Sequence, residues 1–348
     1  MTAVRVSVAG CGSVSGPYLS DLSRSPYVQL VSLCDPVAER RDRRSEEYGV
    51  AETFGSVEEM LGGPHFDLLV NLTPMQEHCA VNKAALQAGR HVYCEKPIAT
   101  AVDEGRELLA IARERGVGLW GAPNAVTSPQ FACISRALAS GELGRVCAAH
   151  GRYGHTGPSW GPWFYRRGGG CLFDLGVYNI TTLTGLLGPV KSVTALAGTA
   201  IPERVVDDET VQVEAEDNVA ILMDHGDAVF SCVQTGFVYG AFSDRHTVEV
   251  IGTGGAANLL GYDWAPRGVE VRVAGSPDWQ KRCLDSNGYS WETGASYIAR
   301  CLAIGEAPLM TGEHALHVLE VMVGALQSAA SGRRVDVSTT FPWPIVGP

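Results

Sequence analysis

The sequence lacks the clustered positive charge that binding to nucleic acid or to an anionic membrane requires. Its 27 lysine and arginine residues are outnumbered by 38 aspartate and glutamate residues, for a formal net charge of −11 at pH 7. The one dense basic run, Arg40 to Arg44, is interrupted by Asp42 and followed by Glu46 and Glu47, so we interpret it as the solvated face of a helix. Proteins that neutralise phosphates need grouped cations, and we expect neither nucleic acid nor membrane as a partner.

A long apolar run and paired cysteines are also missing. No stretch approaches the ~20 apolar residues that span a bilayer, and the first residues enter a predicted strand at once, leaving no room for a secretory leader. The ten cysteines are scattered and form no Cys-x-x-Cys motif. We therefore expect a cytoplasmic protein with reduced thiols, several of them buried (Cys11, Cys34, Cys94 and Cys171).

Metal ligands in a recognisable pattern are lacking as well. His314 and His317 lie in a predicted helix between Glu313 and Glu320. Their i, i+3 spacing provides no third ligand of a known arrangement, and an apolar stripe accounts for the helix as a packing element. We predict no metal site.

What the sequence does contain is enough apolar material for two domains, with 348 residues of which 45% are hydrophobic. Its first 120 residues alternate short apolar strands with helical patterns, which predicts a doubly wound parallel sheet of the Rossmann type. The predicted strands are Val4–Ala9, Val28–Cys34, Phe66–Leu72, His91–Cys94 and Val117–Trp120. The predicted helices are Val14–Ser23, Val37–Tyr48, Val57–Leu61, Gln76–Gln87 and Asp103–Arg115.

After Gly121 the pattern changes from alternation to runs of strands. A helix over Pro129–Ser140 precedes them, and helices over Gly294–Ile304 and Glu313–Ala330 close the chain. The predicted strands are Val146–Tyr153, Val190–Gly198, Val211–Asp224, Ala228–Thr235, Thr247–Gly252 and Val269–Ala274. We therefore predict a Rossmann domain over residues 1–121 and an α+β domain with a mostly antiparallel sheet over residues 122–348.

A glycine turn follows the first strand and opens the first helix. Gly10-Cys-Gly12-Ser13-Val14-Ser15-Gly16 resembles the dinucleotide-binding pattern, except that its third glycine falls one place late and Ser15 stands in that position. Glycine lets the backbone turn sharply and approach a pyrophosphate, which the amides of the helix N-terminus then bind. A mere tight turn is the alternative interpretation.

The second predicted strand favours the cofactor interpretation because it ends at Asp35, 19 residues after Gly16. An acidic residue at about this distance accepts hydrogen bonds from the adenosine ribose. Asp35 would repel a 2′-phosphate, so NAD is favoured; Arg40 and Arg41 leave NADP open.

Lys96 follows the fourth predicted strand, His91–Cys94, and is one of only four lysines beside 23 arginines. Ligands of open α/β sheets bind at the carboxyl ends of strands. A compact ammonium is suited to lie near a reacting hydroxyl and lower a neighbour's pKa, so we predict that Lys96 is catalytic. The alternative is an ordinary surface lysine.

A second cluster begins with three glycines, Gly168 to Gly170, and continues to Asp174 and Tyr178. Residues four apart share one face of a helix, and the glycines allow a backbone or a ligand to come close. The alternative is a flexible loop that enters an ordinary helix.

Several motifs together resemble one family over nearly the whole chain, the Gfo/Idh/MocA oxidoreductases. They are the glycine turn, Asn71-Leu-Thr73-Pro74 with His78, Glu95-Lys96-Pro97, the triple glycine with Asp174-x-Gly176-x-Tyr178, and the closing stretch from Thr311 to Val335. The resemblance implies that Thr73, Pro74, His78 and Glu95 also belong to the cofactor site. It further implies a large open sheet used for oligomerisation, hence a homodimer or homotetramer, and a carbohydrate or polyol substrate.

The sequence departs from many family members in two places. Tyr178 stands where many carry histidine, which is similar to the branch of glucose–fructose oxidoreductase and dihydrodiol dehydrogenase, where tyrosine is the acid/base. Substrate-binding arginines of many relatives are missing near Asn124, which we keep as a candidate contact. Trp163 and Arg166 are further candidates, because aromatic faces pack on sugar C–H groups and arginine binds hydroxyls.

The resemblance implies hydride transfer between nicotinamide and a carbinol carbon, with Tyr178 moving the proton and Asp174 contacting a substrate hydroxyl or Lys96. Free tyrosine titrates near pH 10, and an ammonium about 4 Å away contributes on the order of 4 kcal/mol at an effective dielectric near 20. This energy suffices to lower the pKa of the phenol by about 2–3 units, so Lys96 alone would allow Tyr178 to act as a base near neutral pH. Two alternatives stay open: an NADPH-dependent reductase of a keto- or anhydro-sugar, and a non-catalytic dinucleotide-sensing regulator.

Overall fold

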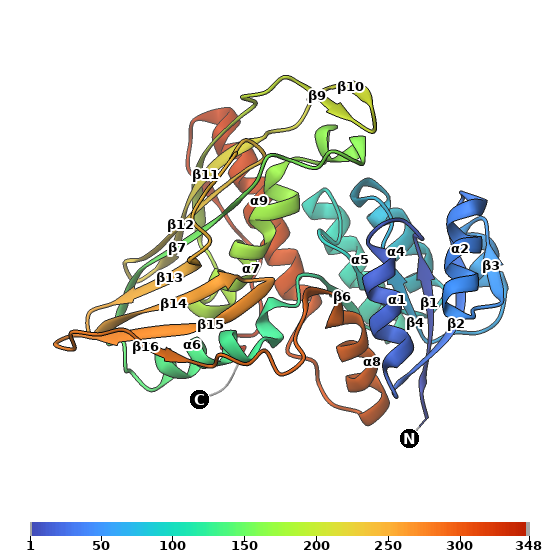
Figure 1. Cartoon of the computed structure of the whole chain (residues 1–348), viewed down its shortest axis with the longest axis horizontal. Coiled ribbons are helices and arrows are strands. Elements are labelled where there is room, and N and C mark those ends of the chain that lie inside the picture. Colours follow the sequence, from blue (N-terminus) through green and yellow to red (C-terminus); the bar gives the residue numbers. More distant parts are fainter. Residues whose placement is uncertain (1, 346–348) are drawn as a thin grey trace. The chain divides into compact units, whose positions relative to one another are not determined.

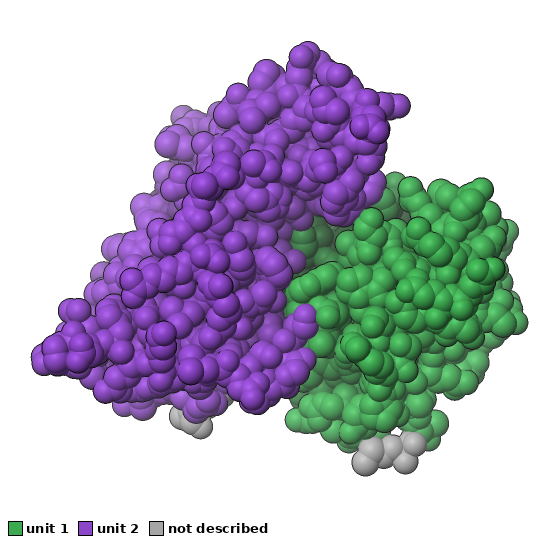
Figure 2. Space-filling model, in the orientation of Figure 1, with its two compact units in different colours: residues 1–124, 291–315 green, residues 125–290, 316–348 purple. Residues whose placement is uncertain are grey.

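The computed structural model describes residues 2–345 (Figure 1). The chain divides into two compact units, one of residues 1–124 and 291–315 and the other of residues 125–290 and 316–348 (Figure 2). Each unit contains one large sheet.

The first unit is built on a six-stranded parallel sheet with the order β3-β2-β1-β4-β5-β6. This is the order of a Rossmann domain, in which ligands bind where the order reverses between β1 and β4. The predicted doubly wound sheet is thus confirmed. Its strands are β1 Val4–Ala9, β2 Val28–Cys34, β3 Glu52–Phe54, β4 Leu68–Asn71, β5 His91–Cys94 and β6 Leu119–Gly121.

Helices alternate with these strands as the sequence predicts. They are α1 Ser15–Arg24, α2 Ala38–Tyr48, α3 Val57–Gly62, α4 His78–Gln87 and α5 Val102–Arg115, with a short 3₁₀ turn Met75–Glu77 before α4. Gly89 and Gly116 adopt left-handed conformations with φ of 72° and 67°, which ends α4 and α5 as glycine does after a helix. The three-residue strand β3 was not predicted.

A second piece of chain, Trp291–Ala315, packs with this unit. It contains the 3₁₀ turn Trp291–Thr293 and α8 Gly294–Ile304, which contacts α1, β1 and β2. The Trp291 ring meets Tyr18 edge-on with centroids 5.5 Å apart. The predicted domain division at residue 121 remains a prediction; the structure adds this distant segment to the first unit's core.

The second unit is built on a nine-stranded sheet with the order β16-β15-β14-β13-β7-β12-β11-β8-β17. Only the β7–β12 pair is parallel, so the predicted mostly antiparallel sheet is confirmed. Its strands are β7 Val146–Gly154, β8 Ser192–Gly198, β11 Asn218–Gly226, β12 Val229–Gly236, β13 His246–Gly252, β14 Gly255–Tyr262, β15 Ala265–Val273, β16 Gln280–Arg282 and β17 Val335–Asp336. A separate hairpin consists of β9 Glu203–Val206 and β10 Glu209–Gln212.

Three helices accompany this sheet: α6 Pro129–Ala139, α7 Val177–Leu187 and α9 Gly312–Ser331. Helices α6 and α7 contact its strands, and Ser328 of α9 accepts a hydrogen bond from the Ala195 amide of β8; α7 and α9 lie on the same side of the sheet in Figure 1. Buried and exposed residues alternate along β11, as expected for a sheet covered on one face. Leu196 and Leu222 are exposed on the other face.

The predicted continuous strand Val211–Asp224 is wrong. The structure has β10 and β11 there, separated by a connection in which the Glu214 and Ala215 amides donate to the Tyr165 carbonyl. Because the backbone partner in this stretch is a loop, no sheet ladder forms. Strand β14, which has no β-branched residue, was not predicted.

Two general expectations can be compared with the described residues 2–345. Among them, no helix is both long and apolar enough to cross a membrane. All ten cysteines in this part of the chain are free thiols, and Cys11, Cys34, Cys94 and Cys171 are buried as predicted.

Candidate active site

The glycine turn between β1 and α1 is shaped for close approach of a ligand. Gly10 has φ +96°, and a Cβ there would lie 2.5 Å from the Leu72 carbonyl oxygen, so only glycine fits. A Cβ at Gly12 would meet nothing within 4 Å. Val14 provides no side-chain cap for α1, which leaves first-turn amides for an anion. The turn therefore fits a dinucleotide pyrophosphate, with Ser13 and Val14 at its open side.

Arg44 closes the other side of this turn. Its Nε donates to the Ser15 hydroxyl at 3.1 Å and its Nη2 to the Gly12 carbonyl at 3.4 Å, while its side chain is only 12% exposed. A Cβ at Gly16 would lie 2.9 Å from this guanidinium. The interpretation of Arg40 to Arg44 as a purely solvated face is therefore wrong for Arg44, whereas Arg40 is exposed.

We expect opposite outcomes for alanine at the two glycines. Gly10→Ala should lower the free energy of unfolding by about 2 kcal/mol or more, since the methyl overlaps backbone and the conformation is strained. Gly12→Ala should keep its stability but raise the dissociation constant for NADH about tenfold, because its methyl occupies space beside the pyrophosphate. Urea unfolding and fluorescence titration would measure both. Equal stability losses, or unchanged NADH affinity in Gly12→Ala, would contradict this assignment.

Asp35 directly follows β2 and is buried, with 5% exposure. Its Oδ2 accepts the Cys11 amide at 2.8 Å and its Oδ1 accepts the Val37 amide at 2.9 Å. Each carboxylate oxygen has a second lone pair, so the carboxylate is fixed beside the glycine turn with capacity left for ribose hydroxyls.

Lys96 follows β5 and is held through the residue before it. The Glu95 Oε2 accepts the Lys96 amide at 3.0 Å, and the Glu95 Oε1 accepts the Tyr18 hydroxyl at 2.6 Å. Burial raises the pKa of Tyr18, as does the neighbouring Glu95 charge, so this phenol stays a donor. The sequence did not single out Tyr18, whose partner is 77 residues away.

His78 holds the other side of the same loop. Its Nδ1 lies 2.6 Å from the Pro97 carbonyl oxygen and its Nε2 lies 2.8 Å from that of Thr73. The ring is 1% exposed, and burial lowers its pKa although both carbonyls favour the protonated form. His78 thus links the loops after β4 and β5 through both nitrogens. Pro74 directly precedes the 3₁₀ turn Met75–Glu77.

Thr73 and Asn124 also make contacts within the first unit. The Thr73 amide and hydroxyl both donate to the Asn71 Oδ1, at 3.2 and 2.7 Å. Asn124 is 1% exposed and its Nδ2 donates to the Thr293 hydroxyl at 3.2 Å. Asn124 therefore connects the end of the first segment to the returning one, and its contact with substrate stays a prediction.

Asp174 and Tyr178 lie at the start of the α7 helical segment in the second unit. Asp174 belongs to a π-helical turn, Leu172–Gly176, which continues into α7 at Val177. Such wide turns are frequent at functional sites. Asp174 is 8% exposed, whereas Tyr178 is half-buried.

Tyr153 of β7 brings these two residues into one cluster. Its ring centroid is 6.4 Å from that of Tyr178, edge-on. Burial raises the pKa of Tyr153, and the Asp174 charge raises it further. Tyr262 and Trp264, stacked on each other at 5.1 Å, also contact Tyr153, at 5.2 and 6.1 Å. No motif or spacing in the sequence points to these three aromatic residues, because only the order of strands in the sheet brings them together beside α7.

Two of the three glycines, Gly169 and Gly170, make room for protein rather than ligand. A Cβ at Gly169 would lie 2.5 Å from the Trp163 carbonyl oxygen, and one at Gly170 would overlap the Glu216 carboxyl. That carboxyl accepts the Leu172 amide at 3.2 Å, at the start of the π-helical turn. Burial raises the pKa of Glu216 to about 7.

Trp163 and Arg166 lie just before the glycines. Trp163 is half-buried in the 3₁₀ turn Pro162–Tyr165, with its ring centroid 5.7 Å from that of Trp160, and Arg166 is exposed. Their contact with substrate stays a prediction.

Of the two helical histidines, His317 has structural partners for both ring nitrogens. The His317 Nε2 accepts the Val190 amide at 2.9 Å, its Nδ1 lies 3.1 Å from Thr339, and burial lowers the pKa of His317 to about 4. Within residues 2–345, no group of three or more histidine, cysteine or acidic side chains is arranged to hold a metal.

The chain is similar to known proteins over nearly its whole length. A 1,5-anhydro-D-fructose reductase of Ensifer adhaerens is 26% identical over 346 residues, covering 96% of this chain and 99% of that enzyme. A trans-1,2-dihydrobenzene-1,2-diol dehydrogenase of Macaca fuscata fuscata is 27% identical over 362 residues, covering 98% of each. A levoglucosan dehydrogenase solved with NADH has the same fold, with a TM-score of 0.87 at 18% identity, over 97% of this chain and 100% of that one.

Two family models match the chain. Residues 4–121 match the oxidoreductase family model with the NAD-binding Rossmann fold, and residues 131–258 match the Gfo/Idh/MocA C-terminal domain. Because these matches together span most of the sequence, the chain belongs to the Gfo/Idh/MocA family of oxidoreductases, and its N-terminal part is a NAD-binding Rossmann domain.

Proposed function

We propose that the protein transfers a hydride between NAD and a carbinol or carbonyl carbon of a sugar, glycoside or cyclic polyol. The observation that carries this proposal is that one chain contains two sets of residues suited to this reaction. One is the glycine turn with Asp35 and the fixed Lys96 loop; the other is the cluster of Asp174, Tyr178 and Tyr153. A sensor that only binds dinucleotide needs no such cluster.

The preference for NAD over NADP rests on Asp35. Its carboxylate is fixed by two backbone amides beside the glycine turn, where it favours ribose hydroxyls and repels a 2′-phosphate. Arg41 donates to the Asp35 carbonyl at 3.0 Å, and Arg40 is exposed. We therefore expect NADP to bind through these two guanidinium groups, but more weakly than NAD.

The substrate class follows from the aromatic cluster and from the relatives. Tyr153, Tyr262 and Trp264 form a wall of contacting rings beside Tyr178, and aromatic faces bury apolar area against the C–H face of a ring. The relatives act on 1,5-anhydro-D-fructose and on trans-1,2-dihydrobenzene-1,2-diol. Both names describe uncharged cyclic compounds with neighbouring oxygens, which is the substrate class we propose here.

The chain's own groups then handle the proton. Tyr178 takes the hydroxyl proton in oxidation and returns it in reduction, and the Lys96 ammonium favours the phenolate form of Tyr178. Asp174 accepts a hydrogen bond from a substrate hydroxyl or from Lys96. When bound, the nicotinamide accepts or supplies the hydride.

The test is a panel of uncharged cyclic compounds with NAD, NADH, NADP and NADPH, followed by the nicotinamide absorbance. We expect turnover with at least one 1,5-anhydro-sugar, levoglucosan-like sugar, aldose or cyclic diol, with kcat/KM higher for the NAD pair. Faster turnover with NADPH and a keto- or anhydro-sugar would favour the reductase alternative. Tight dinucleotide binding without turnover across the panel would favour a regulator and contradict the proposal.

We also infer that the working form is a homodimer or homotetramer. The uncovered face of the nine-stranded sheet exposes Leu196 (76%), Leu222 (48%) and Phe230 (46%). Grouped exposed apolar residues mark interaction sites, and the sheet's size agrees with the oligomerisation role that the family resemblance implies.

A further inference from the structure

Two segments of the second unit are joined by hydrogen bonds at several points. We call residues 155–172 the aromatic loop and residues 199–217, which contain β9 and β10, the strap. Strap amides of Glu214 and Ala215 donate to the Tyr165 carbonyl at 2.8 and 3.2 Å, and that of Asp207 donates to the Ser159 carbonyl at 3.0 Å. The Cys171 amide in turn donates to the Glu216 carbonyl at 3.1 Å. The loop therefore shares several backbone hydrogen bonds with the strap.

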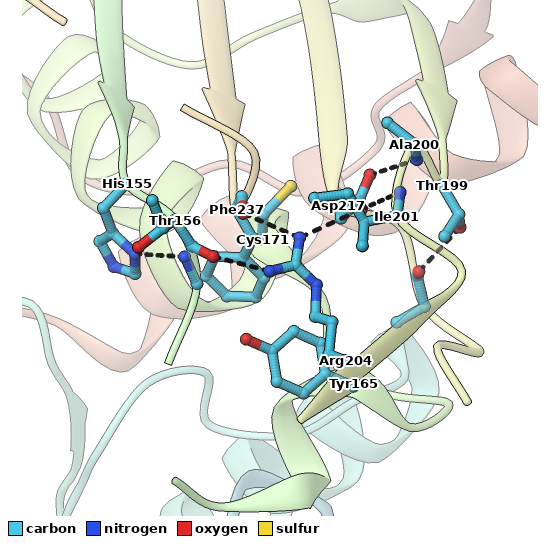
Figure 3. Close-up of polar contacts among 12 residues, drawn as sticks. His155, Thr156, Tyr165, Cys171, Thr199, Ala200, Ile201, Arg204, Asp217 and Phe237 are labelled. Carbon is cyan, nitrogen blue, oxygen red and sulfur yellow. Dashed lines mark hydrogen bonds and ion pairs between the residues drawn. The ribbon is translucent and has the colours of Figure 1, made fainter. Parts of the chain in front are cut away.

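Arg204 of β9 lies at the centre of this arrangement (Figure 3). Its Nη1 donates to the Thr156 carbonyl at 2.6 Å, and its Nη2 donates to the Phe237 carbonyl at 2.8 Å. The guanidinium carbon lies 5.1 Å from the centre of the Tyr165 ring. One side chain thus contacts both the beginning and the middle of the aromatic loop.

Asp217 supplies the matching negative charge. Its Oδ2 lies 3.3 Å from the Arg204 Nη2, and the two side chains are 0% and 9% exposed. The Asp217 Oδ1 and Oδ2 also accept the Ala200 and Ile201 amides at 2.7 and 2.9 Å. Asp217 therefore binds both the start of the strap and the Arg204 guanidinium, as Figure 3 shows.

Tyr165 anchors a further part of the aromatic loop. Its hydroxyl donates to the Pro158 carbonyl at 2.6 Å, and its ring packs on Phe237 with centroids 5.7 Å apart. Trp160 and Trp163 lie within a few residues of these fixed points. Their rings are therefore presented from a loop whose backbone is anchored at Thr156, Pro158 and Tyr165.

A buried charge pair is costly to form and contributes little net stability compared with apolar residues, but it imposes one geometry. Lysine at position 204 would keep the charge but has no planar fork to reach two carbonyls and a carboxylate at once. The arrangement thus favours a positioning role over a purely stabilising one.

We propose that the Arg204–Asp217 pair is a positioning unit that holds the aromatic loop in the conformation that receives substrate. This rests on the proposed function for the existence of a cyclic substrate, and on the predicted contact of Trp163 with that substrate. Arg204 and Asp217 themselves do not touch the reacting atoms. They set how firmly a cyclic substrate is held, and the bound dinucleotide does not depend on them.

The test compares Arg204→Met and Arg204→Lys with Arg282→Met. The last removes a two-pronged ion pair of the same unit, Arg282 with Glu142 at 2.8 and 2.6 Å, that does not contact the loop. In Arg204→Met we expect amide hydrogen exchange over residues 155–172 to accelerate about tenfold or more, with trypsin cleavage after the exposed Arg166 or Arg167. Arg204→Lys should give an intermediate rate, and Arg282→Met the rate of the unmodified protein.

The kinetic readout separates positioning from global stability. Assayed well below the unfolding temperature, Arg204→Met should raise KM for the cyclic substrate about tenfold or more, with the NADH dissociation constant unchanged and with partial recovery in Arg204→Lys. A lower Tm with unchanged loop exchange and unchanged KM would overturn the proposal. Should Arg204→Met fail to fold, Asp217→Asn and Arg204→Lys carry the same comparison. If no compound is turned over, the proposed function fails, whereas loop exchange still decides the positioning role.

Discussion

Tyr178→Phe is expected to lower kcat on the order of 10²–10⁴-fold, the usual contribution of a positioned acid/base. The substitution removes one hydroxyl from a half-buried ring, so the ring contact with Tyr153 at 6.4 Å is retained. The NADH dissociation constant should not change, because the glycine turn and Asp35 are untouched. Steady-state turnover and fluorescence titration of the same preparation would measure both quantities.

Tyr153→Phe is the matched control for this variant. Tyr153 is the neighbouring phenol, but burial and the Asp174 charge raise its pKa. It therefore stays protonated near neutral pH and cannot accept the substrate's proton. We expect Tyr153→Phe to retain far more turnover than Tyr178→Phe. If Tyr153→Phe were the inactive variant and Tyr178→Phe the active one, the proton carrier would be Tyr153 instead.

Lys96→Met is expected to be the second large loss, on the order of 10³-fold in kcat. This corresponds to the ~4 kcal/mol that the ammonium contributes at an effective dielectric near 20 if it lies about 4 Å from the phenol, as we propose. Under the same proposal, its removal raises the pKa of the Tyr178 phenol, so the rise of oxidation rate with pH should move to higher pH. The measurement is the pH profile of kcat/KM in the oxidation direction, compared with that of the unmodified enzyme.

Lys83→Met provides the control, because Lys83 lies in the same unit and its ammonium is 2.6 Å from Glu107 at the surface. Exposed pairs of this kind contribute little, so activity and pH profile should stay unchanged. If Lys96→Met kept its pH profile and lost only NADH affinity, Lys96 would be a cofactor contact and not the group that tunes Tyr178.

Much of the first unit was predictable because its determinants are local. Strands β1, β2 and β5 have the predicted bounds, since runs of apolar residues between glycine turns and amphipathic helices leave few alternatives. The glycine turn and Asp35 were found for the same reason, as their roles depend on fixed distances along the chain.

The remainder depends on residues that are far apart in the sequence. Tyr18 meets Glu95 across 77 residues, and Arg44 meets Ser15 across 29. No periodicity or spacing rule indicates such pairs. Only residues 213–217, the end of the strap, were wrongly predicted as strand, because the Glu214 and Ala215 amides donate to a loop carbonyl and not to a neighbouring strand. How Tyr153, Tyr262 and Trp264 come together likewise depends on sheet order.

The return of Trp291–Ala315 to the first unit has a consequence for how this enzyme can be taken apart. A fragment that ended after β6 would lack α8 and would leave Tyr18 and the apolar sides of β1 and β2 in water. The nucleotide-binding module is thus encoded in two separate stretches. Replacing this module with that of a relative therefore requires both stretches to be exchanged together, because neither stretch alone contains both Tyr18 and the Trp291 ring that packs on it.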